Sequence, residues 1–438
     1  MIKKLKSIKN NPNIMKYIKN SSWLLLEKVF RFGIGFFVSI WIIRYLGPND
    51  FGILSYIQSI LSILSVFVGL GLDGIVLREI VKSTNNRYII FSTALFLRFV
   101  SSLIIILFIY ILQHFILEDT QKYYLLFILS LSLVFEAFSI LKVSFQEKIL
   151  SKYEVFSNLL SLTLGAGLKV CFLYSEADLI YFIYAIVFEK FIYATTLFYF
   201  YQKIEKRLNF DFDVKIGKNL LQNSWPLILS TLSYIVYTRT DQIMIEHFLG
   251  SYEVGIYSAA VRLYELPFII TTIISGTLTP LLYKKYNENK NEFFALTLKI
   301  LSYMSLLAYI IIAFYWIFGK DIILLLFGEK YLESYNVLII LSVIILIQFV
   351  SFLRSSYLIL INQQKLFFYI GIVLSLSNII INYFLIPVYG IMGAIYATLI
   401  VRIISLFVYS FFSPTKLYFY IQIKSLIAIK IFNKGIKK

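Results

Sequence analysis

Residues 46–55 read LGPNDFGILS, and the pattern returns 203 residues later, at residues 249–258, as LGSYEVGIYS. Five positions are identical in the two copies, and Asp50 of the first corresponds to Glu253 of the second. The offset is close to half of the 438-residue chain, which indicates that one structural unit was duplicated. Duplicated membrane units place their binding site at the interface between the halves. The glycines themselves are expected to allow a tight reversal and close helix packing, not to bind a ligand.

The composition around this repeat is that of a membrane protein. Hydrophobic residues make up 59% of the chain and charged residues 15%, with a mean hydropathy of +0.80. A helix that crosses a bilayer needs about 20 mostly apolar residues. Twelve segments qualify: 23–46, 51–70, 88–112, 123–141, 153–174, 179–201, 221–245, 254–282, 294–318, 336–353, 367–387 and 391–413. We therefore expect an all-α polytopic membrane protein with about 12 transmembrane helices in two six-helix bundles around a central cavity.

The domain boundaries follow from the charged segments. Residues 202–222 form a long charged break near the centre, so we expect a six-helix lobe at 1–209 and a second at 210–413. Because each lobe holds an even number of spans, the two copies of the repeat face the same side of the membrane. Residues 414–438 mix lysines with apolar residues and are too charged to span, which favours a basic interfacial cytoplasmic tail.

The net charge of +17 reflects topology. Of the 41 Lys and Arg residues, 29 fall on one side of the predicted membrane, 3 on the other and 9 within spans. By the positive-inside rule both termini are expected to be cytoplasmic. We expect the cations to attract anionic membrane lipids, and we expect no nucleic-acid partner.

The sequence contains no motif that is typical of an enzyme. The chain has one cysteine, Cys171, and two histidines, so we expect no metal site. Residues 69–74 (GLGLDG) match a dinucleotide fingerprint, but they end an apolar span where that motif needs a strand and a βαβ unit. No phosphate-binding Walker loop is present. The sequence therefore predicts a protein that is not an enzyme and needs no cofactor.

Ionisable side chains inside the spans are the candidate functional residues. Each costs about 2.5–3.5 kcal/mol on insertion scales and usually faces a cavity. At 1.5 Å per residue, Arg98 lies about 15 Å into its span, near the bilayer centre. Lys and Arg outnumber Asp and Glu within the spans, and this surplus favours an anionic substrate. The candidate substrate-binding cations are Lys28, Arg31, Arg98, Lys190, Arg239, Arg262 and Arg402.

Three carboxylates accompany these cations. Glu27 and Arg31 are four residues apart on one helix face, and Arg262 and Glu265, three apart, repeat the pairing. Arg239 and Asp241 are two apart and point to different faces. Any single pair is explained equally well as a structural salt bridge between helices, so this alternative stays open.

Several motifs together resemble a known family. They are RYLGPNDFG (44–52), GLGL (69–72), REI (78–80), DQIMI (241–245), FLG (248–250), VGIYSAA (254–260), RLYE (262–265) and YGIMGA (389–394). This set is similar to the Wzx-type polysaccharide or O-antigen flippases of the MOP (multidrug/oligosaccharidyl-lipid/polysaccharide) transporter superfamily. The likeness covers nearly the whole chain and is specific to the superfamily, not to a substrate.

The resemblance implies a MATE-like fold and a flippase. Such a protein moves an undecaprenyl-pyrophosphate-linked oligosaccharide, such as a repeat unit of O-antigen, lipopolysaccharide or capsule, across the membrane by alternating access. A polysaccharide polymerase and a chain-length regulator are its possible partners. Coupling to H⁺ or Na⁺ would use Glu27, Asp241 or Glu265, because a buried carboxylate can titrate near neutral pH. The alternative is a MATE-type small-molecule or drug antiporter, which would more naturally have a cavity dominated by carboxylates.

Overall fold

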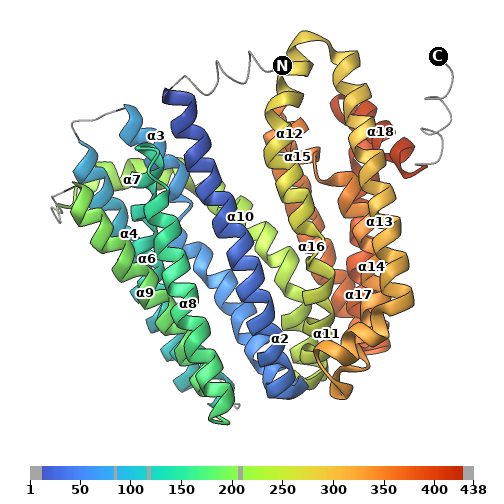
Figure 1. The fold of residues 1–438 in the computed structure, drawn as a ribbon, viewed down its shortest axis with the longest axis horizontal. Helices are drawn as coiled ribbons and strands as arrows, with labels where there is room; N and C mark the ends of the chain where they lie inside the picture. The colour runs from blue at the N-terminus through green and yellow to red at the C-terminus, as the bar shows by residue number, and fades with distance from the viewer. Residues whose placement is uncertain (1–11, 83–85, 116–119, 206–210, 428–438) are drawn as a thin grey trace. The chain divides into compact units, whose positions relative to one another are not determined.

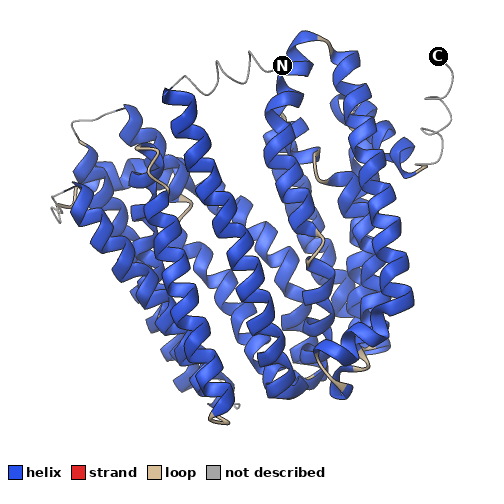
Figure 2. Ribbon diagram, viewed as in Figure 1, coloured by secondary structure: helices blue, strands red, loops and turns tan. Residues whose placement is uncertain are grey.

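The computed structural model describes residues 12–82, 86–115, 120–205 and 211–427 (Figure 1). Within these ranges all regular secondary structure is helical and no strand is present (Figure 2). The all-α prediction is confirmed. Residues 1–11 lie outside the described residues, as do residues 206–210 of the charged break and residues 428–438 of the predicted basic tail.

Ten helical segments of the described chain are long and apolar enough to cross a membrane, so the predicted count of twelve is not confirmed. The predicted spans 23–46 and 51–70 fall in one continuous segment that begins with helix α2 (Pro12–Gly69). The predicted span 221–245 lies in α10 (Val214–Leu249), which is not among the ten. Helix α10 contains Asn219, Asn223, Arg239 and Asp241, and these polar residues lower its hydropathy.

The described chain forms two compact units. Unit 1 comprises residues 1–46 and 57–235, and unit 2 comprises residues 47–56 and 236–438. The division therefore falls inside α2 and inside α10, and the short segment Gly47–Tyr56 belongs to unit 2. The lobe boundary predicted at residue 209/210 stays a prediction.

An apolar cluster joins several helices of unit 1. Leu72, Phe91, Ile140 and Leu197 are among its buried members, and they come from segments far apart in the sequence. The elements of unit 1 are α2 apart from residues 47–56, α10 as far as residue 235, and the helices between them: α3 (Leu72–Lys82), α4 (Arg87–Phe115), α5 (Thr120–Ser130), α6 (Ser132–Ala137), η1 (Phe138–Leu141), α7 (Lys142–Glu147), α8 (Lys152–Tyr174) and α9 (Leu179–Glu205). The predicted span 123–141 is thus a broken run of short helices.

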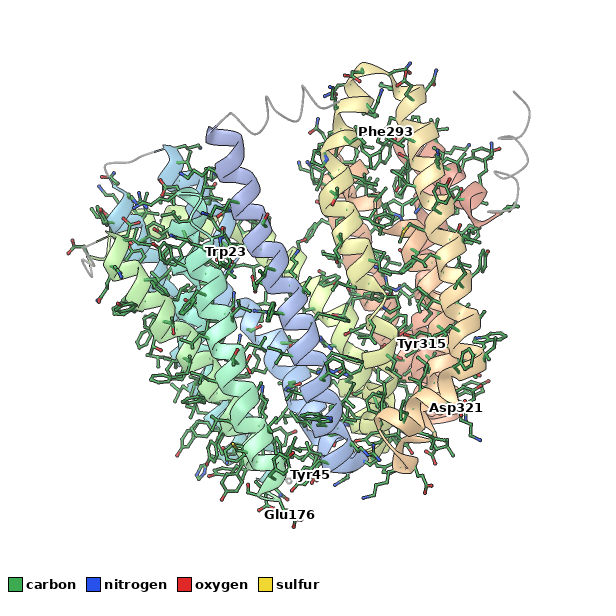
Figure 3. All side chains as sticks on the ribbon, viewed as in Figure 1. Trp23, Tyr45, Glu176, Phe293, Tyr315 and Asp321 are labelled. Carbon is green, nitrogen blue, oxygen red and sulfur yellow. The ribbon has the colours of Figure 1, made fainter. Side chains whose placement is uncertain are left out.

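Unit 2 follows from the end of α10. Its elements are α11 (Ser251–Glu265), α12 (Phe268–Glu288), α13 (Lys290–Leu326), η2 (Glu329–Tyr331), α14 (Ser334–Ser351), α15 (Arg354–Leu360), α16 (Gln364–Tyr389), α17 (Ile391–Val408), η3 (Tyr409–Phe411), η4 (Ser413–Thr415) and α18 (Lys416–Leu426). Asn289 caps α13, because its side chain accepts from the backbone N–H of Asn291. Phe293 and Tyr315 both project from α13 (Figure 3). The Tyr315 hydroxyl donates to the Leu263 carbonyl of α11 at 2.7 Å.

The two copies of the repeated element adopt the same local backbone. Gly47 has φ 71° and ψ 175°, and Gly250 has φ 96° and ψ 176°. Residues with a Cβ rarely adopt these angles. They interrupt the helical backbone at Gly47, inside α2, and at Gly250, directly before α11 begins. The prediction that these glycines let the chain turn tightly is confirmed.

The predicted basic tail contains a docked helix. Residues 416–426 form α18, whose Tyr418, Ile421 and Gln422 are buried in unit 2. Tyr418 stacks on Tyr357 with ring centroids 4.7 Å apart, and the Gln422 amide donates to the Val350 carbonyl at 2.9 Å. The described part of the tail therefore packs into the helical unit on one face and presents Lys416 and Lys424 on the other.

Candidate functional site

The first candidate group lies on α2 in unit 1. Arg31 is 3.3 Å from Glu27, so the predicted pairing along one helix face is present. The same Arg31 nitrogen donates to the Asn158 amide oxygen of α8 at 2.9 Å. The Arg31 side chain nevertheless remains 59% exposed, and Lys28 on the same helix is exposed as well. A guanidinium that is held from two sides but still accessible is suited to bind an anion.

Arg98 of α4 differs, because its side chain is only 3% exposed. It lies 2.7 Å from Asp73 of α3 and donates to the Ser139 hydroxyl at 3.0 Å. Lys142 approaches the other Asp73 oxygen at 3.0 Å. The surplus of unpaired cations predicted within the spans therefore does not include Arg98. The sequence reasoning missed Asp73, because this residue lies beyond the predicted second span and has no helical spacing to Arg98.

Lys190 of α9 is paired but accessible. Its amine lies 2.5 Å from Glu136 of α6, and its side chain is 44% exposed. The neighbouring Glu189 pairs instead with Lys169 of α8 at 2.7 Å. A partly exposed ion pair contributes little to stability, so the Lys190 pair can open toward another anion at small cost.

Unit 2 contains a buried carboxylate surrounded by neutral donors. Asp241 of α10 is 5% exposed. It accepts hydrogen bonds from the hydroxyls of Tyr257 at 2.8 Å and Thr398 at 2.7 Å. The Asn382 amide donates to Asp241 at 2.7 Å and to the Asn378 amide oxygen at 3.1 Å. Among the described residues, no Lys or Arg forms an ion pair with Asp241.

Two polar atoms beside this carboxylate have no partner within the described chain. They are the Asn382 amide oxygen and the Asn378 amide nitrogen, and both residues are fully buried. A buried polar atom without a partner costs free energy, so it requires an explanation. Carboxylate, amide and hydroxyl oxygens together form the donor set that a hard cation or a proton would occupy. These groups come from α10, α11, α16 and α17 and surround one buried carboxylate in unit 2.

The other predicted charges of unit 2 are arranged differently. Arg262 and Glu265 of α11 are both exposed, and no ion pair within 4.0 Å joins them in the described chain, so their predicted pairing is wrong. Arg239 is half-buried while Asp241 is buried, in agreement with the prediction that they point to different faces. Arg402 of α17 donates to Gln348 at 2.8 Å and lies over the Tyr237 ring at 4.9 Å.

Sequence reasoning missed the neutral members of these groups. Asn378 and Asn382 are four residues apart in an otherwise apolar segment, a spacing that places both on one helix face. That pattern was available in the sequence. Asn158 and Thr398 gave no signal of their own, because their partners Arg31 and Asp241 lie more than 100 residues away in the sequence.

Comparisons with known proteins add a family and a fold. A family model described as polysaccharide biosynthesis protein matches residues 42–336, more than half of the chain. The capsular polysaccharide biosynthesis protein CapF of Staphylococcus aureus is 24% identical over 404 residues, which cover 90% of this chain and 98% of that protein. The probable low-salt glycan biosynthesis flippase Agl15 of Haloferax volcanii is 25% identical, with coverages of 88% and 80%.

Solved structures share the arrangement of helices. The lipid II flippase MurJ, in an inward closed conformation, aligns with a TM-score of 0.73 at 17% identity and covers 96% of this chain and 94% of its own. An inward-facing MATE family multidrug transporter of the MOP superfamily aligns with a TM-score of 0.67 at 15% identity, with coverages of 91% and 96%. At these identities the likeness concerns the fold, and it confirms the MATE-like prediction.

Proposed function

The chain belongs to the polysaccharide biosynthesis protein family, and from this premise we propose that it flips a polyprenyl-pyrophosphate-linked oligosaccharide across the cytoplasmic membrane by alternating access. Its membership confirms the resemblance found in the sequence. Its relatives are glycan flippases and transport proteins, and its ten apolar helices are those of a multi-pass membrane protein. We place it in the inner membrane of a bacterium with both termini in the cytoplasm.

The observation that carries the proposal is the exposed Arg31 in the middle of an apolar helix. A guanidinium that is exposed on such a helix would face a polar chamber, where it could bind a pyrophosphate with two hydrogen bonds. Lys28, Lys190, Arg239 and Arg262 are the other accessible or half-buried candidates. Arg98 and Arg402 stay in the proposal as weaker candidates, since the side chain of each already bonds to other residues of its own unit.

The polar groups of the chamber would bind the glycan, while the polyprenyl chain stays in the bilayer. Undecaprenyl pyrophosphate is the carrier that we expect, and the polysaccharide polymerase and chain-length regulator are the proteins that would take the product. Hydrogen-bonding side chains beside the cations, such as Asn158, are suited to sugar hydroxyls.

Transport would be driven by a cation gradient. Asp241 is the best-placed of the three predicted coupling carboxylates, because it is buried, has no cationic partner in the described chain and lies beside the unpaired Asn382 oxygen. Glu27 already neutralises Arg31, and Glu265 is exposed. Na⁺ or H⁺ binding at Asp241 would neutralise a charge that is costly to bury.

A complementation experiment tests the flippase. The chromosomal copy is deleted, and the host receives wild type, Arg31→Ala, Arg31→Lys or the control Lys284→Ala, whose side chain is on an exposed helix end. We expect Arg31→Ala to abolish surface glycan at normal membrane abundance, and Arg31→Lys to restore part of it. The control should resemble wild type.

Other outcomes would contradict this assignment. Normal surface glycan from Arg31→Ala would remove Arg31 from the site, and normal glycan from the deletion strain would remove the flippase function. Raised drug tolerance on overexpression, without a glycan phenotype, would support the MATE-type antiporter instead.

A further inference from the structure

The C-terminal part of the chain carries a positive charge that no neighbouring acid balances. Residues 334–438 contain seven lysines and two arginines but no aspartate or glutamate. All 24 acidic residues of the chain lie in residues 1–333. Any ion pair of these lysines would therefore need a carboxylate from the earlier part of the chain.

The two lysines of helix α18 have no such carboxylate. Lys416 and Lys424 are exposed, and among the described residues no acidic group lies within 4.0 Å of either amine. The lysines at the end of α12 differ, since the Lys285 amine lies 2.6 Å from Glu292 of α13. The cations of α18 are thus available to an anion that is not part of the described chain.

The exposed face of α18 combines these cations with apolar and aromatic side chains. Leu417 is 51% exposed and Tyr420 is 60% exposed. Lys416, Tyr420 and Lys424 are four residues apart, so they follow one another along one helix face. The Lys424 amine lies 5.9 Å from the centre of the Tyr420 ring. Such a face is typical of helices at a membrane surface, where the ring enters the headgroup region and the amines reach the phosphates.

The opposite face holds α18 firmly against unit 2. The Ser305 hydroxyl of α13 donates to the Ser425 carbonyl at 2.5 Å, and the Tyr309 hydroxyl donates to the Leu426 carbonyl at 2.9 Å. These bonds add to the buried contacts of α18 described above, and Figure 1 shows α18 beside α13. The exposed face therefore has one fixed orientation within unit 2.

Helix α13 shows at which depth of the membrane α18 lies. Between Lys299 and Lys320 it has no charged residue, and this interval of 21 residues corresponds to about 31 Å, the thickness of a hydrocarbon core. Ser305, which contacts α18, lies six residues from Lys299, or about 9 Å inside the predicted cytoplasmic edge. Interfacial helices bury their apolar face to a depth of about 5–10 Å. The position of α18 thus agrees with that of an interfacial helix.

We propose that the exposed face of α18 is a binding surface for anionic phospholipids of the cytoplasmic leaflet. The amines of Lys416 and Lys424 bind lipid phosphates, while Leu417 and Tyr420 enter the headgroup region. Anionic lipids attract basic segments at the cytoplasmic surface, and here no acidic residue of the described chain offsets that attraction. This lipid contact does not depend on which substrate the protein moves.

Lipid retention tests the surface. The full chain is purified in detergent and mixed with equal amounts of phosphatidylglycerol and phosphatidylcholine that have the same acyl chains. Native mass spectrometry then counts the lipids that stay bound. Wild type is compared with Lys416→Gln/Lys424→Gln, with Lys416→Arg/Lys424→Arg and with the control Lys284→Gln/Lys285→Gln. The control removes the same charge from a helix end whose lysines lie close to glutamates.

We expect wild type to retain phosphatidylglycerol in preference to phosphatidylcholine, and the glutamine variant of α18 to lower this preference about tenfold or more. The arginine variant and the control should keep it. An equal loss in the control would overturn the proposal, because net charge alone would then explain the binding. The absence of any preference in wild type would overturn it as well.

A spin label measures the depth of α18 independently. In a Cys171→Ser background the label is placed at Tyr420→Cys, with Lys284→Cys, an exposed residue at the end of α12, as the aqueous reference. In nanodiscs that contain phosphatidylglycerol, we expect a water-soluble nickel complex to reach label 420 much less than label 284, while dissolved oxygen reaches label 420 readily. Equal access of the nickel complex to both labels would overturn the proposal, and the basic face would then fit an acidic protein segment instead.

Discussion

Charged side chains of the apolar helices fall into two groups by exposure. Arg98 is buried and bonds to Asp73 and Ser139, so its charge is matched inside unit 1. Arg31 is held by Glu27 and Asn158 but remains largely exposed. Removing a partner from the first group leaves an uncompensated buried charge, which is strongly destabilising. Only the second group can exchange its partners for those of a substrate.

Asn158 should orient Arg31 for the anion. In Asn158→Ala the guanidinium loses one of its two acceptors, so we expect the apparent affinity for lipid-linked substrate to fall a few-fold, while the maximal rate changes little. Initial transport rates in proteoliposomes at several substrate concentrations measure both. Asn223→Ala is the matched control, because its amide bonds only within its own helix, to Asn219. A wild-type apparent affinity in Asn158→Ala would show that Asn158 does not orient Arg31 for the substrate.

Asp241 should bind the coupling cation. Asp241→Asn keeps the shape but removes the negative charge, so we expect transport to lose its response to a Na⁺ or H⁺ gradient. Proteoliposomes with one imposed gradient at a time measure this response and identify the ion. Glu265→Gln, an exposed carboxylate of the same unit, should keep it. A gradient response of wild-type size in Asp241→Asn would exclude this carboxylate from coupling.

At the scale of elements, helix α18 is tied to the end of another helix. The Val350 carbonyl lies in the last turn of α14, where the helix supplies no donor of its own, and Gln422 provides one. Gln422→Ala leaves this buried carbonyl unsatisfied, so we expect a loss of about 1–3 kcal/mol of stability. Thermal unfolding of the purified protein should show a lower Tm. Lys424→Ala, on the exposed face of the same helix, should not change it, and an equal shift in both variants would refute the role of Gln422.

Helix α11 carries residues that belong to several of the groups described above. Within its 15 residues it carries Gly255, which packs against the Pro48 carbonyl, Tyr257 on the Asp241 carboxylate, and the exposed Arg262 and Glu265 near its end. A helix rises 1.5 Å per residue, so the glycine and Arg262 are only about 10 Å apart. A change at Asp241 can therefore reach the exposed charges through one rigid element.

The sequence predicted most of the fold but only part of the site. Apolar length located the helices, and the repeat located the two turns, because both are local properties of the chain. The partner of Arg98 could not be predicted, since Asp73 is 25 residues away and its approach depends on how α3 packs on α4. Arg262 and Glu265 have helical spacing for a pair, yet no ion pair within 4.0 Å joins them in the described chain. Spacing fixes which face two residues share, while tertiary packing decides whether they meet.

At the scale of the whole molecule, the distribution of lysine and arginine predicts the orientation. Tyr252 follows the seventh predicted span and Lys284 follows the eighth, so we expect them on opposite sides of the membrane. In intact cells of a Cys171→Ser strain, a membrane-impermeant maleimide should label Tyr252→Cys and should label Lys284→Cys only after lysis. The reverse pattern would invert the proposed topology, and labelling of both in intact cells would refute the intervening span.

Unit 2 is not continuous in the sequence, and this affects how the protein is made. Residues 47–56 are synthesised 203 residues before the equivalent residues that they contact. During that interval the early turn has no partner, although most of unit 1 has already emerged from the ribosome. Long-range contacts of this kind form late and slowly, so residues 47–56 stay without this contact until residues 251–255 have been synthesised. Unit 2 can therefore be completed only when an early segment and a late segment of the chain have both been synthesised.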